Sequence, residues 1–255
     1  MLPPTERFGD RVDDYVRSRP SYPPTAIDVL RDIVGLTPAS SIADVGCGTG
    51  IFAAQLLMTG ATIIGVEPNG PMREACTKLL AKNHRFRVLK GTAEVTGLND
   101  SSVDLVTAAQ AFHWFKESES RTEFRRILRP NGWVALIWNE RKSKGSQFAQ
   151  GYELILKECS PEYATVTHRN HPDQDILDWF QNPAAKVHVF EHATGLDLAN
   201  FLGRAYSSSY VPAEGTPERE VITNRLTQLF RDHETEGSVS MEYEAKLFLG
   251  QLGLD

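Results

Sequence analysis

The stretch Asp44-Val45-Gly46-Cys47-Gly48-Thr49-Gly50 decides the fold of this 255-residue chain. It follows a short β-rich run at 41–45 and opens a segment of helical character at 50–58. Glycines at such a turn let the backbone bend tightly and come close to a ligand. The helix that follows adds N–H donors and the positive end of a dipole. The stretch therefore predicts a loop that binds a nucleotide-like ligand, the alternative being a tight turn with no ligand.

A regular alternation of strands and helices surrounds this loop. Four further strands are predicted at 61–66, 85–89, 103–108 and 133–138, with helices at 70–82 and 117–128, the latter leading into a turn at 129–132. Strands that alternate with helices indicate βαβ units and a mostly parallel sheet. After residue 140 the pattern changes to helices at 147–159, 172–181, 196–205 and 216–234, with strands at 186–192 and 242–249.

Composition and charge exclude several classes of protein. The formal net charge is −6, with 27 Lys and Arg against 33 Asp and Glu, so a general binder of nucleic acid is not expected. The three cysteines include no C-x-x-C pair, which favours reduced thiols. The first ten residues show no secretory signal and no apolar run approaches the length of a bilayer. We expect a cytoplasmic protein with neither a nucleic-acid nor a membrane partner.

Two features narrow the ligand of the glycine loop. A dinucleotide fingerprint, G-x-G-x-x-G, would need glycine at position 51, where this chain has Ile51. Glu67 closes the second strand, 23 residues after Asp44, and is placed to accept hydrogen bonds from ribose hydroxyls. A pyrophosphate site gains little from an acid inside the loop. The methionine end of S-adenosylmethionine carries an ammonium, which an acid such as Asp44 suits. The pattern favours S-adenosylmethionine over a dinucleotide.

The sequence resembles the class I S-adenosylmethionine-dependent methyltransferases, and within them the small-molecule branch that includes trans-aconitate methyltransferase-like proteins. The resemblance covers residues 8–140 best. It implies an α/β, Rossmann-like sheet of seven mostly parallel strands with the last strand antiparallel, helices on both faces and helical insertions in the C-terminal half. The stretches that carry it are the arm 15–23, the glycine loop, 91–94, 110–115 and the turn 128–133.

On this basis we expect one methyltransferase domain over residues 1–255. Its parts are an N-terminal arm at 1–24, a cofactor-binding core at 25–140, substrate-side helices and the sixth strand at 141–240, and the last strand at 241–255.

The resemblance also implies which residues bind S-adenosylmethionine. Asp44 and the loop backbone should hold its methionine end, and Glu67 both ribose hydroxyls. An acid usually reads the adenine after the third strand. This chain has Thr92 there, so either Thr92 with the backbone of Ala93 reads the ring, or Glu94 does, unless Glu94 only starts a helix. The expected cofactor-binding set is Tyr15, Arg19, Asp44, Gly46, Cys47, Gly48, Gly50, Glu67, Pro68, Thr92, Ala93, Glu94 and Gln110.

Arg19 and the residues expected on the acceptor side carry further expectations. Arg19 suits the methionine carboxylate, unless its Pro-rich arm is only a rigid spacer with a solvated arginine. His113 and Trp114 are the catalytic candidates in a loop that faces the methyl donor, since ring faces attract cations. Phe115 and one other aromatic of 112–115 should anchor the core. Basic residues near 141 lie in a loop that either steers an anionic substrate or is merely solvated.

Residues 196–215 should form part of a lid over the acceptor, the alternative being a structural helix with Arg204 solvated. The expected substrate set is Tyr22, His113, Arg204, Tyr206, Ser208 and Tyr210, and no metal site is expected.

These expectations lead to one reaction: transfer of a methyl group from S-adenosylmethionine to a small acceptor, with S-adenosylhomocysteine as product. A carboxylate acceptor needs no general base at neutral pH, whereas a hydroxyl or an amine does, and His113 is the candidate base. The alternatives are a nicotinamide-dependent oxidoreductase, a methyltransferase of RNA or protein, and a cofactor-binding protein without catalysis. We expect a monomer or a homodimer.

Overall fold

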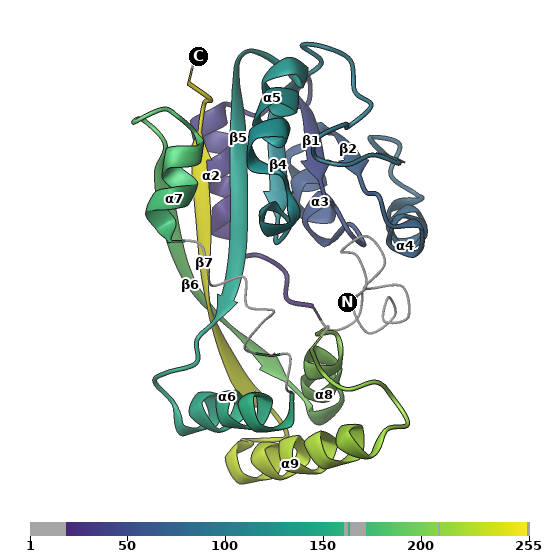
Figure 1. The fold of residues 1–255 in the computed structure, drawn as a ribbon, viewed down its shortest axis with the longest axis vertical. Helices are drawn as coiled ribbons and strands as arrows, with labels where there is room; N and C mark the ends of the chain where they lie inside the picture. Colours follow the sequence, from purple (N-terminus) through teal and green to yellow (C-terminus); the bar gives the residue numbers. More distant parts are fainter. Residues whose placement is uncertain (1–18, 161–162, 164–171, 209, 254–255) are drawn as a thin grey trace.

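Seven strands form one sheet in the computed structural model, which describes residues 19–160, 163, 172–208 and 210–253. Only β7 runs antiparallel to its neighbours, so the expected sheet is confirmed (Figure 1). In spatial order the strands are β3 (Phe86–Leu89), β2 (Thr62–Val66), β1 (Ser41–Val45), β4 (Val103–Ala109), β5 (Leu128–Arg141), β7 (Val239–Gly250) and β6 (Lys186–Leu196).

Helices cover both faces of this sheet. On one face, α2 (Pro24–Val34), α3 (Ile51–Leu56) and α4 (Gly70–Leu80) bury side chains against β1 and β2. On the other face, α5 (Glu117–Ile127) and α7 (Asp173–Trp179) pack their aromatic residues against β4 and β5. Short 3₁₀ turns lie at Leu57–Thr59 and Phe112–Trp114. The two faces explain why the inner strands are apolar almost throughout, because each of their side chains meets a helix.

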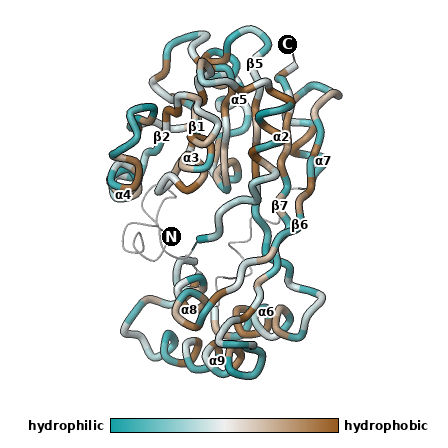
Figure 2. Tube along the Cα trace, turned by 180° about the vertical axis from the view of Figure 1, so that it is seen from behind, coloured by the Kyte–Doolittle hydropathy of each residue, from teal (hydrophilic) through white to brown (hydrophobic). Residues whose placement is uncertain are grey.

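Three more helices form a lobe beyond the carboxyl end of β5. They are α6 (Gln147–Cys159), α8 (Leu198–Tyr206) and α9 (Pro217–His233), and they share an apolar cluster with the far ends of β6 and β7. Figure 1 shows β6 and β7 running from the sheet down into this lobe. In Figure 2 the three helices carry hydrophobic and hydrophilic segments side by side, as amphipathic helices do.

The strand boundaries differ from the sequence expectation in the second half. β6 and β7 are longer than predicted because they pair without interruption from Lys186 opposite Leu249 to Leu196 opposite Val239. The predicted turn at 129–132 lies inside β5. There the register shifts between Leu128 and Trp133, and Asn131 adopts a φ of 64°. The extra residues bulge out of the ladder, so α5 passes directly into a strand.

No helix among the described residues combines the length and the apolar character that crossing a bilayer requires.

Candidate active site

The three glycines of the loop have different physical tasks. All adopt a positive φ, 69° at Gly46, 55° at Gly48 and 88° at Gly50. A Cβ at Gly46 would lie 2.6 Å from the Cβ of Ala111, and one at Gly50 would lie 2.7 Å from the sulfur of Cys76. A Cβ at Gly48 would meet nothing within 4 Å. Two glycines therefore allow close packing, whereas Gly48 keeps the space in front of the loop open.

Asp44 is a buried carboxylate at the end of β1, just before the loop. Its side chain is fully buried, and Oδ1 accepts a 2.7 Å hydrogen bond from the Thr107 hydroxyl on β4. Oδ2 is buried and meets no hydrogen-bond donor among the residues the structure describes. Burial raises the pKa of Asp44 to about 7; the Thr107 hydrogen bond opposes this shift and the charge of Glu67 adds to it. Such a group favours a nearby cation.

Glu67, at the end of β2, ties the loop to its neighbour strand. One carboxylate oxygen accepts from the backbone N–H of Gly48 and the other from that of Asn69, each at 2.9 Å. Burial raises the pKa of Glu67, and these two hydrogen bonds work in the opposite direction. In this structure the carboxylate therefore bonds the backbone, and a ribose would have to exchange with one of these donors.

A thiol pair lies beside the loop. Cys47 and Cys76 are both buried and reduced. The neighbouring Cys76 thiol and burial raise the pKa of Cys47 well above its ordinary value. Both cysteines are free thiols, as the sequence predicts, and the raised pKa keeps the Cys47 thiol protonated at neutral pH.

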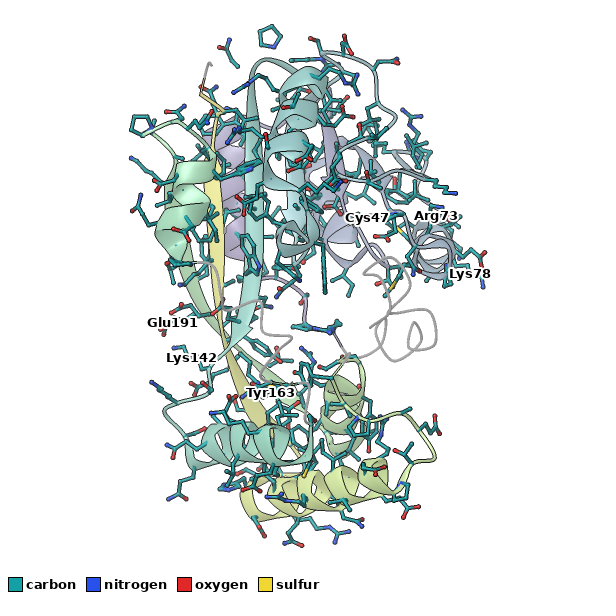
Figure 3. All side chains as sticks on the ribbon, in the orientation of Figure 1. Cys47, Arg73, Lys78, Lys142, Tyr163 and Glu191 are labelled. Atoms are coloured by element: carbon teal, nitrogen blue, oxygen red, sulfur yellow. The ribbon has the colours of Figure 1, made fainter. Side chains whose placement is uncertain are left out.

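A cavity of about 130 Å³ lies between the glycine loop and the lobe. Figure 3 labels Cys47 on the side of the sheet and Tyr163 on the side of the lobe, and both line the cavity. The described residues that line it are Arg19, Pro20, Tyr22, Gly46, Cys47, Gly48, Thr49, Ile51, Phe52, Ala109, Gln110, Asn139, Arg141, Tyr152, Tyr163, Arg204, Ser208, Tyr210, Met241 and Tyr243.

The charged side chains among the described lining residues of this cavity are all arginines. Three arginines line it, and none of the described lining residues is Asp, Glu, Lys or His. Arg141 donates to Glu153 on α6 at 2.7 Å and lies over the Tyr152 ring, with 4.4 Å from its Cζ to the ring centroid. Arg204 is 8% exposed and donates to the Tyr243 hydroxyl at 2.8 Å. The Glu153 carboxylate and the Tyr152 ring hold Arg141 in place, and the Tyr243 hydroxyl holds Arg204. Guanidinium groups held in this way suit the binding of an anion.

The arm segment, defined here as residues 19–23, closes one side of the cavity. Tyr22 packs against Phe52 with 4.9 Å between ring centroids, and its backbone N–H and C=O both bond the side-chain amide of Gln55. Arg19 donates to the carbonyl oxygen of Ser207, just past the end of α8, at 3.1 Å. The arm is thus ordered here and joins the glycine-loop side to the lobe, rather than leaving Arg19 simply solvated.

Several predicted site residues do not belong to the described lining of this cavity, and their roles stay predictions. Tyr206 bonds Thr223 through its hydroxyl and stacks against Arg219, so it faces α9 rather than the cavity. His113 is half-buried, Trp114 is 37% exposed, and neither lines the cavity. Their 3₁₀ turn follows β4, but the residue that reaches the cavity there is Gln110. Phe112 and Phe115 pack in the core, as expected of two of these aromatic residues.

The expected adenine-reading residues lie outside the cavity wall. Thr92 accepts from the backbone N–H of Val95, and Ala93 is buried in the core. Glu94 accepts from the N–H of Lys116, next to the start of α5, at 2.9 Å. Pro68 accepts from the Arg73 guanidinium through its carbonyl. Adenine recognition by this region stays a prediction. Tyr15 lies outside the described residues.

The sequence expectation missed the residues that line the far side of the cavity. Asn139, Arg141, Tyr152, Tyr163, Met241 and Tyr243 come from four segments, and no local motif connects them. Thr49 was missed although it stands inside the glycine loop, and its buried hydroxyl has no partner among the described residues. The cluster of basic residues near 141 was the available signal, since one of its two readings was an anionic substrate.

Comparison with known proteins agrees with this geometry. Residues 43–136 match a family model described as a methyltransferase domain. A protein of Mycobacterium tuberculosis named as an uncharacterised methyltransferase is 36% identical over 160 residues, 63% of each chain. One from Schizosaccharomyces pombe is 37% identical over 153 residues, 60% of this chain and 59% of that one. The chain therefore matches somewhat less than two thirds of the length of these relatives.

Solved structures share the fold over most of the chain. A structure from Anaeromyxobacter dehalogenans, assigned as a type II methyltransferase, superposes with a TM-score of 0.63 at 22% identity, covering 92% of this chain and 98% of that one. A methyltransferase assigned to an antibiotic biosynthesis pathway of Anabaena variabilis gives a TM-score of 0.62 at 21% identity, covering 88% and 96%.

Residues 43–136 thus match a methyltransferase domain, and the sheet order, the glycine loop and the shared fold agree with a class I S-adenosylmethionine-dependent methyltransferase. S-adenosylmethionine is the cofactor of this class. The described residues fit it, because Gly48 leaves open space in front of the loop and an unpartnered carboxylate oxygen of Asp44 lies behind it. This finding sets aside the nicotinamide-dependent alternative.

Proposed function

We propose that this protein methylates an oxygen atom of a small carboxylate, with S-adenosylmethionine as the methyl donor. One observation carries the proposal: the cavity beside the glycine loop has three arginines on its walls and no side chain of Asp, Glu, Lys or His among its described lining. Guanidinium groups bind carboxylates through paired hydrogen bonds. The chain as a whole carries a net charge of −6, so this concentration of positive charge is local to the cavity.

The described lining of the cavity contains no general base, and this distinguishes a carboxylate from other acceptors. A hydroxyl or amine acceptor needs a group that takes its proton, whereas a carboxylate is ionised well below neutral pH. His113, the candidate base, does not line the cavity. Burial raises the pKa of the Tyr152, Tyr163 and Tyr243 hydroxyls above their ordinary value, so these groups are not bases at neutral pH either. An acceptor that arrives ionised fits this cavity best.

The residues of the chain then act by placement and by exclusion of water. When bound, the cofactor supplies an electrophilic methyl group on a sulfonium. Gly48 allows close approach of the loop backbone, and Gln110 borders the same space from β4. Arg204 and Arg141 orient the acceptor from the lobe, while the arm segment covers the side. Fixed orientation of two reactants removes much of the entropic barrier of a bimolecular step.

The lobe of α6, α8 and α9 is, in this proposal, the acceptor side of the same domain. A cavity of about 130 Å³ suits a small molecule rather than a protein or RNA segment, so we propose neither a nucleic-acid nor a membrane partner. A cytoplasmic monomer or homodimer remains our expectation.

The test is a panel of small mono-, di- and tricarboxylates, phenols and amines with isotopically labelled S-adenosylmethionine. We expect methyl esters from the carboxylates. Arg204→Gln should raise the acceptor KM by roughly 10- to 100-fold, because a charge-assisted hydrogen bond contributes about 1.5–3 kcal/mol, and should leave the affinity for S-adenosylhomocysteine unchanged.

Arg219→Gln is the matched control, since Arg219 stacks on Tyr206 and does not line the cavity. Turnover of phenols or amines alone, or equal kinetics of the two variants, would contradict the carboxylate assignment.

A further inference from the structure

Asn139 joins three parts of the molecule that are distant in sequence. Its backbone carbonyl accepts from the side-chain amide of Gln110 at 2.9 Å. Its side-chain nitrogen donates to the carbonyl oxygen of Ser21 in the arm segment at 3.2 Å, and its side-chain oxygen lies 2.9 Å from Nε2 of His192. Asn139 is 6% exposed, so these hydrogen bonds are shielded from water.

The pairing register explains how the two side chains meet. Asn139 lies opposite Ala245, and His192 lies opposite Tyr243, on the two flanks of β7. Opposite residues in adjacent strands point to the same face, and Tyr243 and Ala245 are two positions apart, so all four share that face. The small side chain of Ala245 leaves room for Asn139 and His192 to meet across the strand. His192 also stacks on the Tyr243 ring, with 5.3 Å between centroids and 19° between planes.

The hydrogen bond from Asn139 to Ser21 determines which ring nitrogen of His192 carries a proton. A carbonyl oxygen accepts only, so the nitrogen of the Asn139 amide faces Ser21 and its oxygen faces His192. Nε2 of His192 must therefore carry a proton and donate. Burial, and next the charge of Arg204, lower the pKa of His192. The imidazole thus acts as a neutral donor that holds the Asn139 amide in one orientation.

We propose that His192, which does not line the cavity, is a positioning residue that sets the arm segment over the cavity through Asn139. The arm contributes Arg19, Pro20 and Tyr22 to the cavity wall. Without the donor at His192, the amide is no longer held toward Ser21, and the arm loses its connection to β5. The consequence for ligand binding rests on the proposed function, whereas the consequence for the arm does not.

Two substitutions at His192 separate the N–H donor from the aromatic ring. His192→Phe keeps an aromatic ring next to Tyr243 and removes the N–H. His192→Gln places an amide N–H near the position of Nε2 and removes the ring. His188→Phe is the matched control, since His188 lies on the same strand and the same face, four residues before His192 and opposite Leu247. Asn139→Ala removes both side-chain bonds and gives the upper limit of the effect.

The first measurement is amide hydrogen exchange of the ligand-free full chain, read from peptides that cover residues 19–30. We expect His192→Phe to speed exchange of the arm segment roughly fivefold, the loss of one neutral hydrogen bond. His192→Gln and His188→Phe should match the wild type. Unchanged exchange in His192→Phe, or equally fast exchange in His192→Gln, would overturn the inference.

The second measurement is calorimetric titration with S-adenosylhomocysteine. His192→Phe should bind several-fold more weakly and His192→Gln like the wild type, with the thermal midpoints of the ligand-free proteins equal. Equal losses in both variants together with lower midpoints would show a general structural role and overturn the inference. If the wild type binds no S-adenosylhomocysteine while arm exchange responds as expected, the proposed function fails and the positioning role stands.

Discussion

Asp44 shows how one residue can connect strand packing with ligand affinity. Its carboxyl is buried between β1 and β4, where only the Thr107 hydroxyl donates to Oδ1 and no described donor meets Oδ2. A buried, half-satisfied carboxylate is costly to ionise unless a cation comes near. The methionine end of the cofactor carries such a cation. The affinity for the cofactor should therefore depend on the charge of Asp44.

We predict that the affinity for S-adenosylhomocysteine rises from pH 6 to pH 8. The pKa of Asp44 is raised to about 7, so the carboxyl is mostly neutral at pH 6 and mostly ionised at pH 8. Only the ionised form attracts the ammonium, and the gain should approach tenfold per pH unit below the pKa. Calorimetric titration across this range measures it.

Two variants control that experiment. Asp44→Asn should bind weakly with little dependence on pH. Thr107→Val removes the hydrogen bond that lowers the pKa of Asp44, so it should shift the transition to higher pH. A wild-type affinity that is flat from pH 6 to 8 would show that Asp44 does not couple to the ligand.

At the scale of an element, α5 is fastened by one carboxylate. Glu123 is 8% exposed and accepts from the backbone N–H and the hydroxyl of Thr96, at 2.8 and 2.5 Å. Arg126, one turn along the helix, donates to both of its oxygens. This cluster holds the loop before β4 against α5. The same loop contacts the start of α5, where Glu94 accepts from the backbone N–H of Lys116.

We predict that Glu123 makes the protein sensitive to acid between pH 4.5 and pH 2. Burial by itself would raise the pKa of Glu123, but hydrogen bonds from Arg126 and Thr96 lower it to about 2. A lowered folded-state pKa means that the stabilisation is complete above pH 4.5 and is lost as the pH falls toward 2. The difference amounts to about 3 kcal/mol.

Urea unfolding of the wild type and of Glu123→Gln at pH 7 and pH 3 tests this prediction. The variant should be less stable at pH 7 by about 3 kcal/mol, and the difference between the two proteins should shrink at pH 3. An equal difference at both pH values would mean that the carboxylate charge contributes nothing.

At the scale of the whole molecule, two strands unite the sheet and the lobe. The lobe has its own apolar cluster, in which Phe201 is fully buried against Phe148, Tyr152 and Phe230. β6 and β7 run through both this cluster and the sheet without a break in their pairing (Figure 1). Continuous strands should transmit unfolding from one part to the other.

We predict a single cooperative transition that Phe201→Ala moves as a whole. The substitution leaves a cavity in the lobe and should cost about 3–5 kcal/mol. The tryptophans at 114, 133, 138 and 179 all lie outside the lobe, so their fluorescence reports on the sheet side, while far-ultraviolet circular dichroism reports on both.

The two signals should coincide in wild type and variant. A loss of helix signal before the fluorescence change in Phe201→Ala would show that the lobe unfolds independently. Ile51→Val, at the wall of the cavity and outside the lobe, provides a comparison with a smaller expected cost of about 1 kcal/mol.

The sequence by itself determined the alternation of strands and helices, the glycine loop and the class of cofactor, while the resemblance implied the seven strands and the antiparallel last one. The first three depend on local patterns: strand and helix periodicities, glycines between a strand and a helix, and an acid at a strand end. The lengths of β6 and β7 were underestimated because their far ends are stabilised by each other rather than by local composition. The bulge at 129–132 was predicted as a turn because Pro130 and Asn131 have the same local conformational preferences in a bulge as in a turn.

Only the tertiary structure decided which residues line the far side of the cavity. Arg204 and Tyr206 stand two residues apart on α8, yet the first lines the cavity and the second faces α9. The sequence pattern of α8 indicates that both faces of the helix are partly buried, but it does not indicate which residues each face contacts. Arg141, Tyr152 and Tyr243 come together from β5, α6 and β7 for the same reason. Packing partners depend on how distant elements dock, and no short stretch of sequence encodes that docking.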